Sequence, residues 1–211
     1  MLGSDVNFLI GYSGHGLVVA EAAILSGCLL SGYFDLKEVR NNPFELKYMG
    51  NERMIDFEKF EERASFLLGI GDNNQRLKVA TFLSKMGFKL ATIIHPNSSI
   101  SELSRIDKGV FIARGVCINP LATIGENAII NTAAVIDHEC IIEANAHVGP
   151  GVVLAGNVRV ESGAFVGANS VVRQGLSVGA NSIVGAGSVV VKSVPANQLW
   201  VGNPAAHLNR F

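Results

Sequence analysis

The sequence lacks the features that mark membrane, secreted and nucleic-acid-binding proteins. It contains no run of 18 apolar residues and no basic segment before its first apolar stretch, so it predicts neither a membrane span nor a signal peptide. The net charge is −1 and no Lys/Arg run occurs, which argues against a nucleic-acid partner or an anionic membrane surface. We therefore expect a cytoplasmic protein.

Cysteines and aromatic residues are also scarce. The three cysteines, Cys28, Cys117 and Cys140, form no CxxC pair, so we expect reduced thiols and no metal site. Aromatic residues make up 7% of the chain, whereas glycine is abundant at 23 residues. This composition predicts a tightly turning architecture in which backbone contacts dominate.

A six-residue repeat fills the second half of the chain. An aliphatic anchor residue recurs at every sixth position from Ile94 to Val190 without an insertion. Four positions after each anchor the residue is small or aliphatic, as at Ala128, Cys140 and Ser170. The position directly after the anchor is often Gly, Asn or Asp, and we interpret these residues as left-handed turn residues. Examples are Asp107, Asn119, Gly125, Asn131, Asp137, Gly149, Gly167, Gly179 and Gly185.

A period of six fits neither an α-helix nor an ordinary hairpin. It is typical of a β-solenoid, in which short strands alternate with sharp corners and each coil stacks on the one before. Three repeats per coil give a triangular prism. The prism is expected to cover residues 95–211, because the period takes over near His95 and Pro96.

This pattern resembles the hexapeptide-repeat acyltransferases. The ending WVGNPAAHL (200–208) is similar to the C-terminal turn of that family, with its xGxPA motif. The resemblance implies a left-handed parallel β-helix, assembly as a homotrimer, and acetyl-CoA bound between neighbouring subunits.

The first half of the chain alternates strands and helices. Apolar strands are expected at 6–11, 28–35, 65–73 and 88–94, with helices after the first glycine loop and at 74–86; a charged stretch at 37–64 has weak periodicity. Strand, helix and strand in alternation predict a small Rossmann-like α/β domain over residues 1–94, with a parallel sheet.

The loop GYSGHG (11–16) follows the first strand and opens the first helix. Backbone N–H groups at such a helix start can hold phosphate, and Asp35, at the end of the next strand, is placed to meet a ribose hydroxyl. Two alternatives stay open. The loop could be an NAD fingerprint, although its spacing is GxxGxG, or a tight strand-to-helix turn without a ligand.

The GxSGHG loop fused to a hexapeptide prism is similar to the nucleotide-sugar N-acetyltransferases, including the UDP-4-amino-sugar enzymes of the bacillosamine pathway and the GDP-perosamine enzymes. Sialic-acid O-acetyltransferases share this layout. The resemblance covers essentially the whole chain. It implies that the nucleotide sugar is bound by Ser13, Gly14, His15, Asp35 and Gly71.

The segment VIDHECII (135–142) places ionisable residues in the repeat without breaking it. His138 is two residues after an anchor, so it should point outward, and Gly156, one coil further along, leaves space above its ring. The adjacent Glu139 can orient the imidazole and raise its basicity. A histidine so placed can act as general base for acetyl transfer to an amine. The alternative is a solvated surface histidine.

The family resemblance agrees with this interpretation. It implies that His138 is the general base, that Glu139 tunes it, that Asn131 contacts the substrate, and that His147, Ala168 and Ala186 contact acetyl-CoA. Cys140 occupies an inward small position and is expected to pack, while Asp137 is expected to be a turn residue. Arg173, Lys192 and Arg210 could either meet CoA phosphates or lie solvated at the surface.

The sequence therefore predicts an acetyltransferase that moves acetyl from acetyl-CoA to the amino group of a nucleotide-linked 4-amino-deoxy sugar. One alternative is O-acetylation of a sialic-acid-type sugar with the same histidine. Another is a prism that binds or assembles without catalysis, although such a scaffold has no need of His138, Glu139 and His147.

Overall fold

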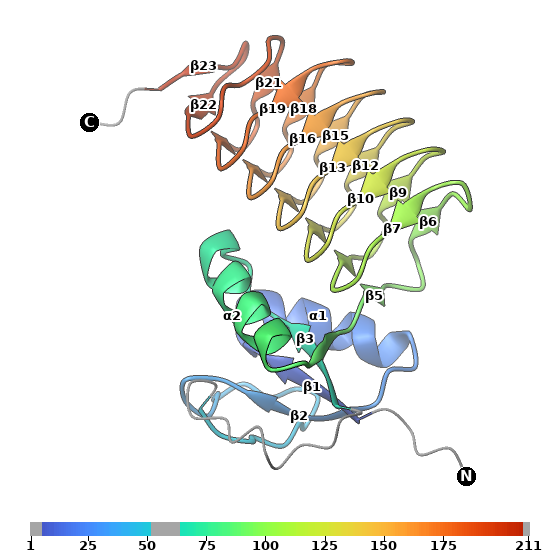
Figure 1. Ribbon diagram of the computed structural model, residues 1–211, viewed down its shortest axis with the longest axis vertical. Coiled ribbons are helices and arrows are strands. Elements are labelled where there is room, and N and C mark those ends of the chain that lie inside the picture. The colour runs from blue at the N-terminus through green and yellow to red at the C-terminus, as the bar shows by residue number, and fades with distance from the viewer. Residues whose placement is uncertain (1–5, 52–63, 209–211) are drawn as a thin grey trace. The chain divides into compact units, whose positions relative to one another are not determined.

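The computed structural model describes residues 6–51 and 64–208 (Figure 1). The chain divides into two compact units, residues 1–96 and residues 97–211. Part of the charged stretch noted in the sequence, residues 52–63, lies outside the described residues.

The first unit contains a parallel sheet of four strands in the order β2-β1-β3-β4. The strands are β1 (Val6–Ile10), β2 (Leu30–Phe34), β3 (Ala64–Leu68) and β4 (Lys89–Leu90). Phe8, Phe34 and Phe66 point into its core with ring centroids 5.7 to 6.4 Å apart. The predicted parallel α/β domain is confirmed.

Two helices pack on this sheet. Helix α1 (Gly14–Leu25) is almost entirely apolar and buries Val19, Ala20 and two further alanines. Helix α2 (Asn73–Lys85) begins at Asp72, whose side chain accepts a 2.8 Å hydrogen bond from the Gln75 N–H and so satisfies one free donor of the first turn.

One predicted strand is interrupted. The sequence predicts a single strand over 88–94, but the chain forms β4 and then, after Ala91 and Thr92, a separate strand β5 (Ile93–Ile94). The Ala91 N–H still donates to Phe66 O at 2.9 Å, so the sheet contact of the first half ends there. An apolar run alone does not show where a strand leaves its sheet.

The second unit is a triangular prism of stacked coils. Over residues 99–190, strands pair in parallel at a spacing of 18 residues, as Ile129 does with His147 and Val135 with Val153, whereas the last described strand pairs antiparallel with the strand before it. Three repeats per coil, as the sequence predicts, therefore form one turn (Figure 1).

The three faces of the prism are named here by one central strand each. The β14 face contains β8 (Phe111–Ile112), β11 (Ile129–Ile130), β14 (His147–Val148), β17 (Phe165–Val166), β20 (Ile183–Val184), β22 (Leu199–Val201) and β23 (Ala206–His207). The β12 face contains β6 (Ser99–Ile100), β9 (Cys117–Ile118), β12 (Val135–Ile136), β15 (Val153–Leu154), β18 (Val171–Val172) and β21 (Val189–Val190). The β13 face contains β7 (Arg105–Ile106), β10 (Thr123–Ile124), β13 (Ile141–Ile142), β16 (Arg159–Val160) and β19 (Ser177–Val178).

The anchors of the repeat fill the prism interior. Every anchor from Ile112 to Val190 is at most 2% exposed. Each such aliphatic side chain contributes about 1.5–3 kcal/mol through burial. Buried serines at the small positions satisfy their hydroxyls internally, as where Ser170 Oγ donates to Gly185 O at 2.9 Å.

The left-handed residues lie elsewhere in the repeat than the sequence predicts. They occur three positions after each anchor, from Gly109 to Gly187, and the glycines directly after the anchors do not have this conformation. Those glycines allow coils to approach instead. A Cβ on Gly149 would lie 2.6 Å from Val166 O, and one on Gly167 would lie 2.5 Å from Ala186 N. The prediction of left-handed turns at these positions is therefore wrong, and the reason for glycine is steric.

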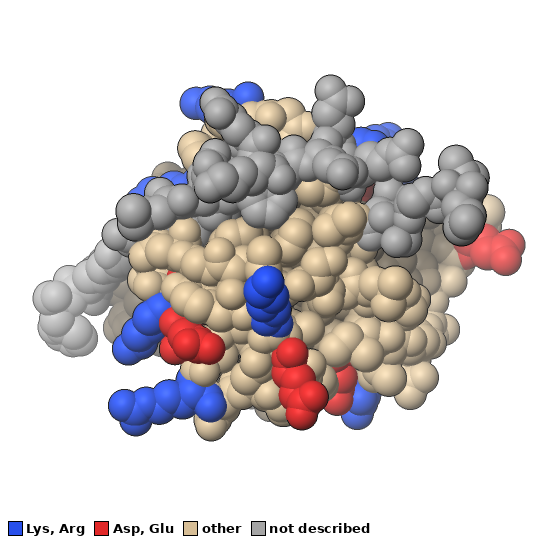
Figure 2. Space-filling view, turned by 90° about the horizontal axis from the view of Figure 1, so that it is seen from below, with Lys and Arg blue, Asp and Glu red and all other residues tan. Residues whose placement is uncertain are grey.

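Two further features concern the helices and the surface charge. Neither described helix has the length and apolar character needed to span a bilayer. On the face shown in Figure 2, acidic and basic side chains of the described residues are interspersed among uncharged ones.

Candidate functional site

The glycine loop of the first unit is packed backbone against backbone. A Cβ on Gly16 would lie 2.1 Å from Gly11 O, and one on Gly69 would lie 2.0 Å from the same atom. These glycines are therefore needed for the close approach of β1, α1 and the end of β3. By contrast, Ser13 and Gly14 are exposed, and the Ser13 side chain makes no capping hydrogen bond. Both remain accessible to a ligand at the start of α1.

His15 lies against the loop that follows β3. A Cβ on Gly71 would lie 3.6 Å from His15 Cβ, so the two predicted residues are neighbours. Burial, with a smaller contribution from the Arg76 cation, lowers the pKa of His15 from its ordinary 6.5 to about 4. At neutral pH, His15 is thus an uncharged imidazole that can donate one hydrogen bond and accept another.

Arg76 holds the same loop in place, and the sequence analysis missed it. Its guanidinium is 1% exposed and donates to Ile70 O at 3.3 Å, Gly71 O at 3.1 Å and Asn73 Oδ1 at 2.8 Å. Burial lowers its pKa to about 10, which keeps it a cation at neutral pH. An arginine in the first turn of an exposed-looking helix gives no sequence signal for this inward orientation.

Asp35 fixes the other side of the loop. Its Oδ2 accepts the Tyr12 N–H at 2.8 Å, and its Oδ1 accepts the Leu36 N–H at 2.7 Å. The carboxylate therefore shapes the turn after β1, and each oxygen retains a second lone pair for a ligand.

In the prism, His138 and Glu139 form a pair at the edge between the β12 and β13 faces. His138 Nδ1 is 3.0 Å from Glu139 Oε2, and the side chains are 48% and 57% exposed. Because the carboxylate is the acceptor, Nδ1 carries the proton, which leaves the Nε2 lone pair of the neutral ring available as a base. Glu139 has φ = 59°, and its carboxylate reaches the ring of the preceding residue.

Gly156 supports the imidazole ring. A Cβ on Gly156 would lie 2.4 Å from both Cε1 and Nε2 of His138, so any side chain there would displace the ring. The coils are held together at this point, because the Asn157 N–H donates to His138 O at 2.8 Å. The predicted space above the imidazole is confirmed.

The neighbours of the pair have structural roles, and the packing role predicted for Cys140 is the one observed. Asp137 Oδ1 accepts the His138 N–H and the Asn119 Nδ2 donor, both at 2.8 Å, and these hydrogen bonds, that of Asn119 first, lower the pKa of the carboxyl group. Cys140 is fully buried, its Sγ contacts Ala155 O at 3.3 Å, and burial raises the pKa of the thiol. A nucleophilic cysteine needs an accessible thiolate, and both the burial and the raised pKa of Cys140 oppose this.

A second polar pair links His147 on the β14 face to Asn131 at the edge between the β14 and β12 faces. Asn131 Nδ2 is 3.1 Å from His147 Nε2, while Asn131 Oδ1 accepts the Thr132 N–H at 2.8 Å. The amide nitrogen must therefore be the group that faces the ring, so His147 Nε2 is the acceptor and the proton sits on Nδ1. His147 is 7% exposed and packs edge-on against Phe165, with ring centroids 5.0 Å apart.

Ala168 and Ala186 follow Asn131 along one edge of the prism. Ala168 and Ala186 stand at equivalent positions in successive coils where the β14 face meets the β12 face, and the Gly187 N–H donates to Ala168 O at 2.8 Å. Arg173 and Lys192 are exposed, whereas Arg210 lies outside the described residues.

One chain does not bring all predicted prism residues together. His138 and Glu139 occupy the edge between the β12 and β13 faces, but Asn131, Ala168 and Ala186 occupy the edge between the β14 and β12 faces, and His147 lies on the β14 face itself. A whole face separates the base from the other group.

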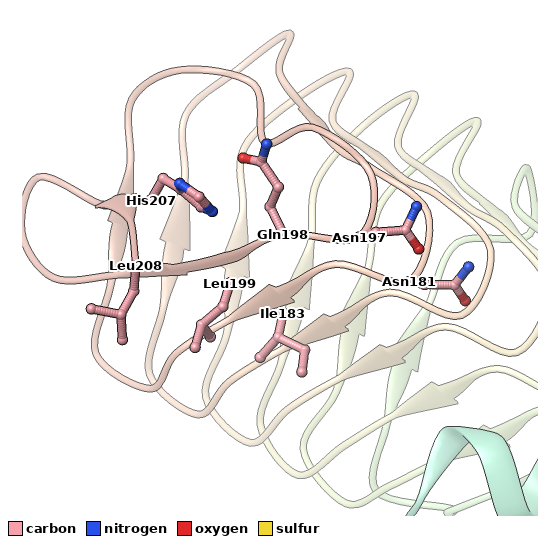
Figure 3. Close-up of a pocket in the computed structure, with 7 residues that line it drawn as sticks. All are labelled: Asn181, Ile183, Asn197, Gln198, Leu199, His207 and Leu208. Carbon is pink, nitrogen blue, oxygen red and sulfur yellow. The ribbon is translucent and has the colours of Figure 1, made fainter. Parts of the chain in front are cut away.

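A pocket that the sequence did not indicate opens near the C-terminal coils (Figure 3). It is lined by amide and apolar side chains with one imidazole, from Asn181, Ile183, Asn197, Gln198, Leu199, His207 and Leu208. None of these is a predicted site residue. Within the described residues, no three His, Cys, Asp or Glu side chains gather in a way that could hold a metal ion.

Comparisons with known proteins match both units. The family model described as "PglD N-terminal domain" matches residues 8–83. Two hexapeptide-repeat models match the prism, "Bacterial transferase hexapeptide (six repeats)" at 121–156 and "Hexapeptide repeat of succinyl-transferase" at 157–192.

Solved structures match the chain over its whole length. A histidine-to-alanine variant of GDP-perosamine N-acetyl transferase from Caulobacter crescentus, in complex with CoA and GDP-perosamine, is 34% identical with a TM-score of 0.90, and the match covers 100% of this chain and 99% of that one. The chain belongs to the hexapeptide-repeat N-acetyltransferases with a PglD-type N-terminal domain.

Two further structures resemble this N-acetyltransferase. The acetyltransferase domain of PglB from Neisseria gonorrhoeae, in complex with acetyl coenzyme A, is 28% identical with a TM-score of 0.91, covering 98% of this chain and 100% of that one. WeeI from Acinetobacter baumannii, at 24% identity, shares the fold with a TM-score of 0.85, covering 96% and 99% of the two chains. These matches confirm the predicted left-handed parallel β-helix.

The lowered pKa of His15 predicts a pH dependence of stability. Between about pH 6.5 and 4 the unfolded chain binds a proton at His15 that the folded protein does not, so stability falls as the pH falls through this window. His15→Gln should remove this dependence. We expect the melting temperature of the wild type to drop by a few degrees more than that of the variant between pH 7.5 and 4. Parallel curves would contradict the assignment.

The contact between Gly156 and His138 predicts a coupling of their mutations. Gly156→Ala should lower the melting temperature, because the methyl group meets the ring and Gly156 has no left-handed φ to add strain. In a His138→Ala background the same substitution should cost almost nothing. Thermal unfolding of the four proteins in this cycle measures the coupling, and equal costs in both backgrounds would show that the clash lies elsewhere.

Proposed function

We propose that this N-acetyltransferase moves the acetyl group of acetyl-CoA to the amino group of a nucleotide-linked 4-amino-deoxy sugar, with His138 as general base. The observation that carries the proposal is the His138–Glu139 pair, with Nδ1 and Oε2 3.0 Å apart. It stands in a chain that matches, over its full length, an enzyme bound to CoA and GDP-perosamine.

His138 has the geometry for a direct transfer. Its Nε2 would take a proton from the amine as the amine nitrogen attacks the thioester carbon, and Glu139 would hold the resulting imidazolium. When the C–S bond breaks, the same proton returns to the departing thiolate sulfur. This direct transfer requires no covalent intermediate on the protein. The burial of the Cys140 thiol agrees with that.

The oxygen of the tetrahedral intermediate needs a hydrogen-bond donor. The Gly156 backbone lies beside the His138 ring, and within the described residues its N–H donates to no acceptor. This N–H is therefore a candidate for stabilising the negative charge that develops on the acetyl oxygen.

The first unit would hold the nucleotide. Ser13 and Gly14 offer an accessible helix start for a phosphate group, and Asp35 retains acceptor capacity for a ribose hydroxyl. Neutral His15 beside Gly71 can hydrogen-bond an uncharged group without placing a buried charge there. We assign these five residues to nucleotide-sugar binding on that basis.

The separation of His138 from the other prism residues favours a homotrimer. We propose that Asn131, His147, Ala168 and Ala186 of one subunit face His138 of the next, with acetyl-CoA between them and Asn131 in contact with the acceptor. A cyclic assembly repeats one such interface at each subunit boundary.

Because acetyl-CoA and nucleotide sugars are cytoplasmic metabolites, we place the reaction in the cytoplasm.

The role of His138 can be tested by substitution. His138→Ala should fold normally and reduce kcat by roughly 10²–10⁴-fold, the usual contribution of a general base. Glu139→Gln, which keeps a hydrogen-bond acceptor but removes the charge, should cause a smaller loss. Thiol release from acetyl-CoA, with nucleotide-linked amino sugars as acceptors, measures the rates. Near-wild-type turnover of His138→Ala would contradict the assignment.

The same assay separates the two acceptor classes. Matched acceptors that carry a hydroxyl in place of the amine, together with free sialic acid, test O-acetylation. Turnover of these and not of the amino sugars would favour the O-acetyltransferase alternative.

A site shared between subunits predicts complementation. His138→Ala and His147→Ala proteins should each be nearly inactive, but mixed trimers should regain activity wherever an intact His138 meets an intact His147 from its neighbour. Random mixing would restore about a quarter of the sites in a cyclic trimer. Co-expression with two affinity tags, followed by the thiol-release assay, measures this fraction.

The matched control mixes His138→Ala with Glu139→Gln. Both substitutions affect the same edge, so mixed trimers should gain nothing beyond the activity of their separate subunits. Native mass spectrometry confirms that mixed trimers have formed. If the activity of the His138→Ala and His147→Ala mixture then does not exceed that of the control mixture, both histidines belong to the site of one subunit.

A further inference from the structure

One corner of the prism carries a residue that does not suit its backbone. From Gly109 to Gly187, each residue three positions after an anchor is left-handed. Asn or Gly occupies these corners, as suits the conformation, with three exceptions: Leu121, Ala133 and Glu139. Glu139 belongs to the proposed catalytic pair, and Ala133 presents only a methyl group.

Leu121 is the exception that local structure does not explain. Its φ is 65°, a conformation that a branched, bulky side chain strongly disfavours. The side chain is also 59% exposed, so burial within this chain does not offset the strain. A strained residue that persists without packing indicates that its side chain serves another purpose.

The register places Leu121 next to the catalytic pair. It lies 18 residues before Glu139, hence at the equivalent corner of the preceding coil, and the Glu139 N–H donates to Pro120 O at 3.1 Å. Gly156 lies on the opposite side of His138, in the following coil. The residues assigned to acetyl-CoA, His147, Ala168 and Ala186, also belong to coils on the C-terminal side of His138. Leu121 therefore borders the side of His138 that is left for the acceptor.

We propose that Leu121 is a specificity residue that contacts the apolar face of the acceptor sugar beside the reacting amine. The inference rests on the proposed function and concerns the role of this one residue: in a 4-amino-deoxy acceptor, Leu121 would contact the methyl group that replaces a hydroxymethyl group. A leucine side chain favours that methyl group and offers no hydrogen bond to a hydroxyl. Discrimination of roughly tenfold is typical of such a contact.

Leu121→Asn tests the proposal, because asparagine is the residue that equivalent corners use. The variant should be as stable as the wild type or more so, since the strain at this corner is relieved. We expect kcat/KM for a deoxy amino-sugar nucleotide to fall roughly tenfold while the KM for acetyl-CoA stays unchanged. The preference for the deoxy acceptor over its hydroxymethyl analogue should disappear.

Leu103→Asn is the matched control. Leu103 is 68% exposed at the same corner one coil further from Glu139, and it is not left-handed. It should leave both acceptor parameters unchanged. Unaltered acceptor preference in Leu121→Asn would overturn the proposal.

Measuring the assembly state distinguishes the proposal from a second interpretation, in which Leu121 is a contact between subunits. If Leu121→Asn dissociates the oligomer in light scattering and weakens both substrates equally, the leucine is a subunit contact and the proposal is wrong. If the wild type itself acetylates no amino sugar, the proposed function fails and this inference falls with it. An active wild type with an indifferent Leu121→Asn variant counts against the leucine alone.

Discussion

The hydrogen bonds between successive coils are the constraint on which the prism and its sites depend. Each coil advances by 18 residues, and backbone N–H and C=O groups pair at every level, as between Asn157 N and His138 O. An outward residue therefore stands directly over the residue 18 places before it. Once this register is set, the neighbours of His138 are determined by sequence position: Pro120 and Leu121 on one side, Gly156 and Asn157 on the other.

Close backbone approach explains glycine in both units. Gly16 and Gly69 allow two chain segments to reach Gly11 O, and Gly156 allows an imidazole to lie over the backbone of the next coil. In each case the absent Cβ makes room for a specific neighbour, and the neighbour in the prism is the proposed base. The polar groups in the first unit are then arranged around this tight packing. Asp35 receives the Tyr12 N–H, and buried Arg76 holds the carbonyl groups beside His15.

Much of this could be predicted from the sequence, because the six-residue period fixes which side chains face inward. The anchors, the packing role of Cys140 and the exposed His138–Glu139 pair all follow from it. The backbone conformation within each repeat does not follow from the period, because glycine occurs both where coils approach closely and where the backbone is left-handed. The left-handed turns were therefore predicted two residues too early. The inward orientation of Arg76 and the break between β4 and β5 depend on tertiary contacts that no local pattern encodes.

The corner residues show how this fold acquires chemistry without losing its stacking. The inward positions are committed to packing, whereas a corner side chain points outward and can carry a reactive group without disturbing the core. A left-handed corner normally accepts only Gly or Asn, so a different residue there costs stability. Glu139 has the strained left-handed backbone, and its carboxylate reaches the ring of the preceding residue, His138. Leu121 bears the same cost at the same corner of the preceding coil, so the strained corners adjoin one another beside His138.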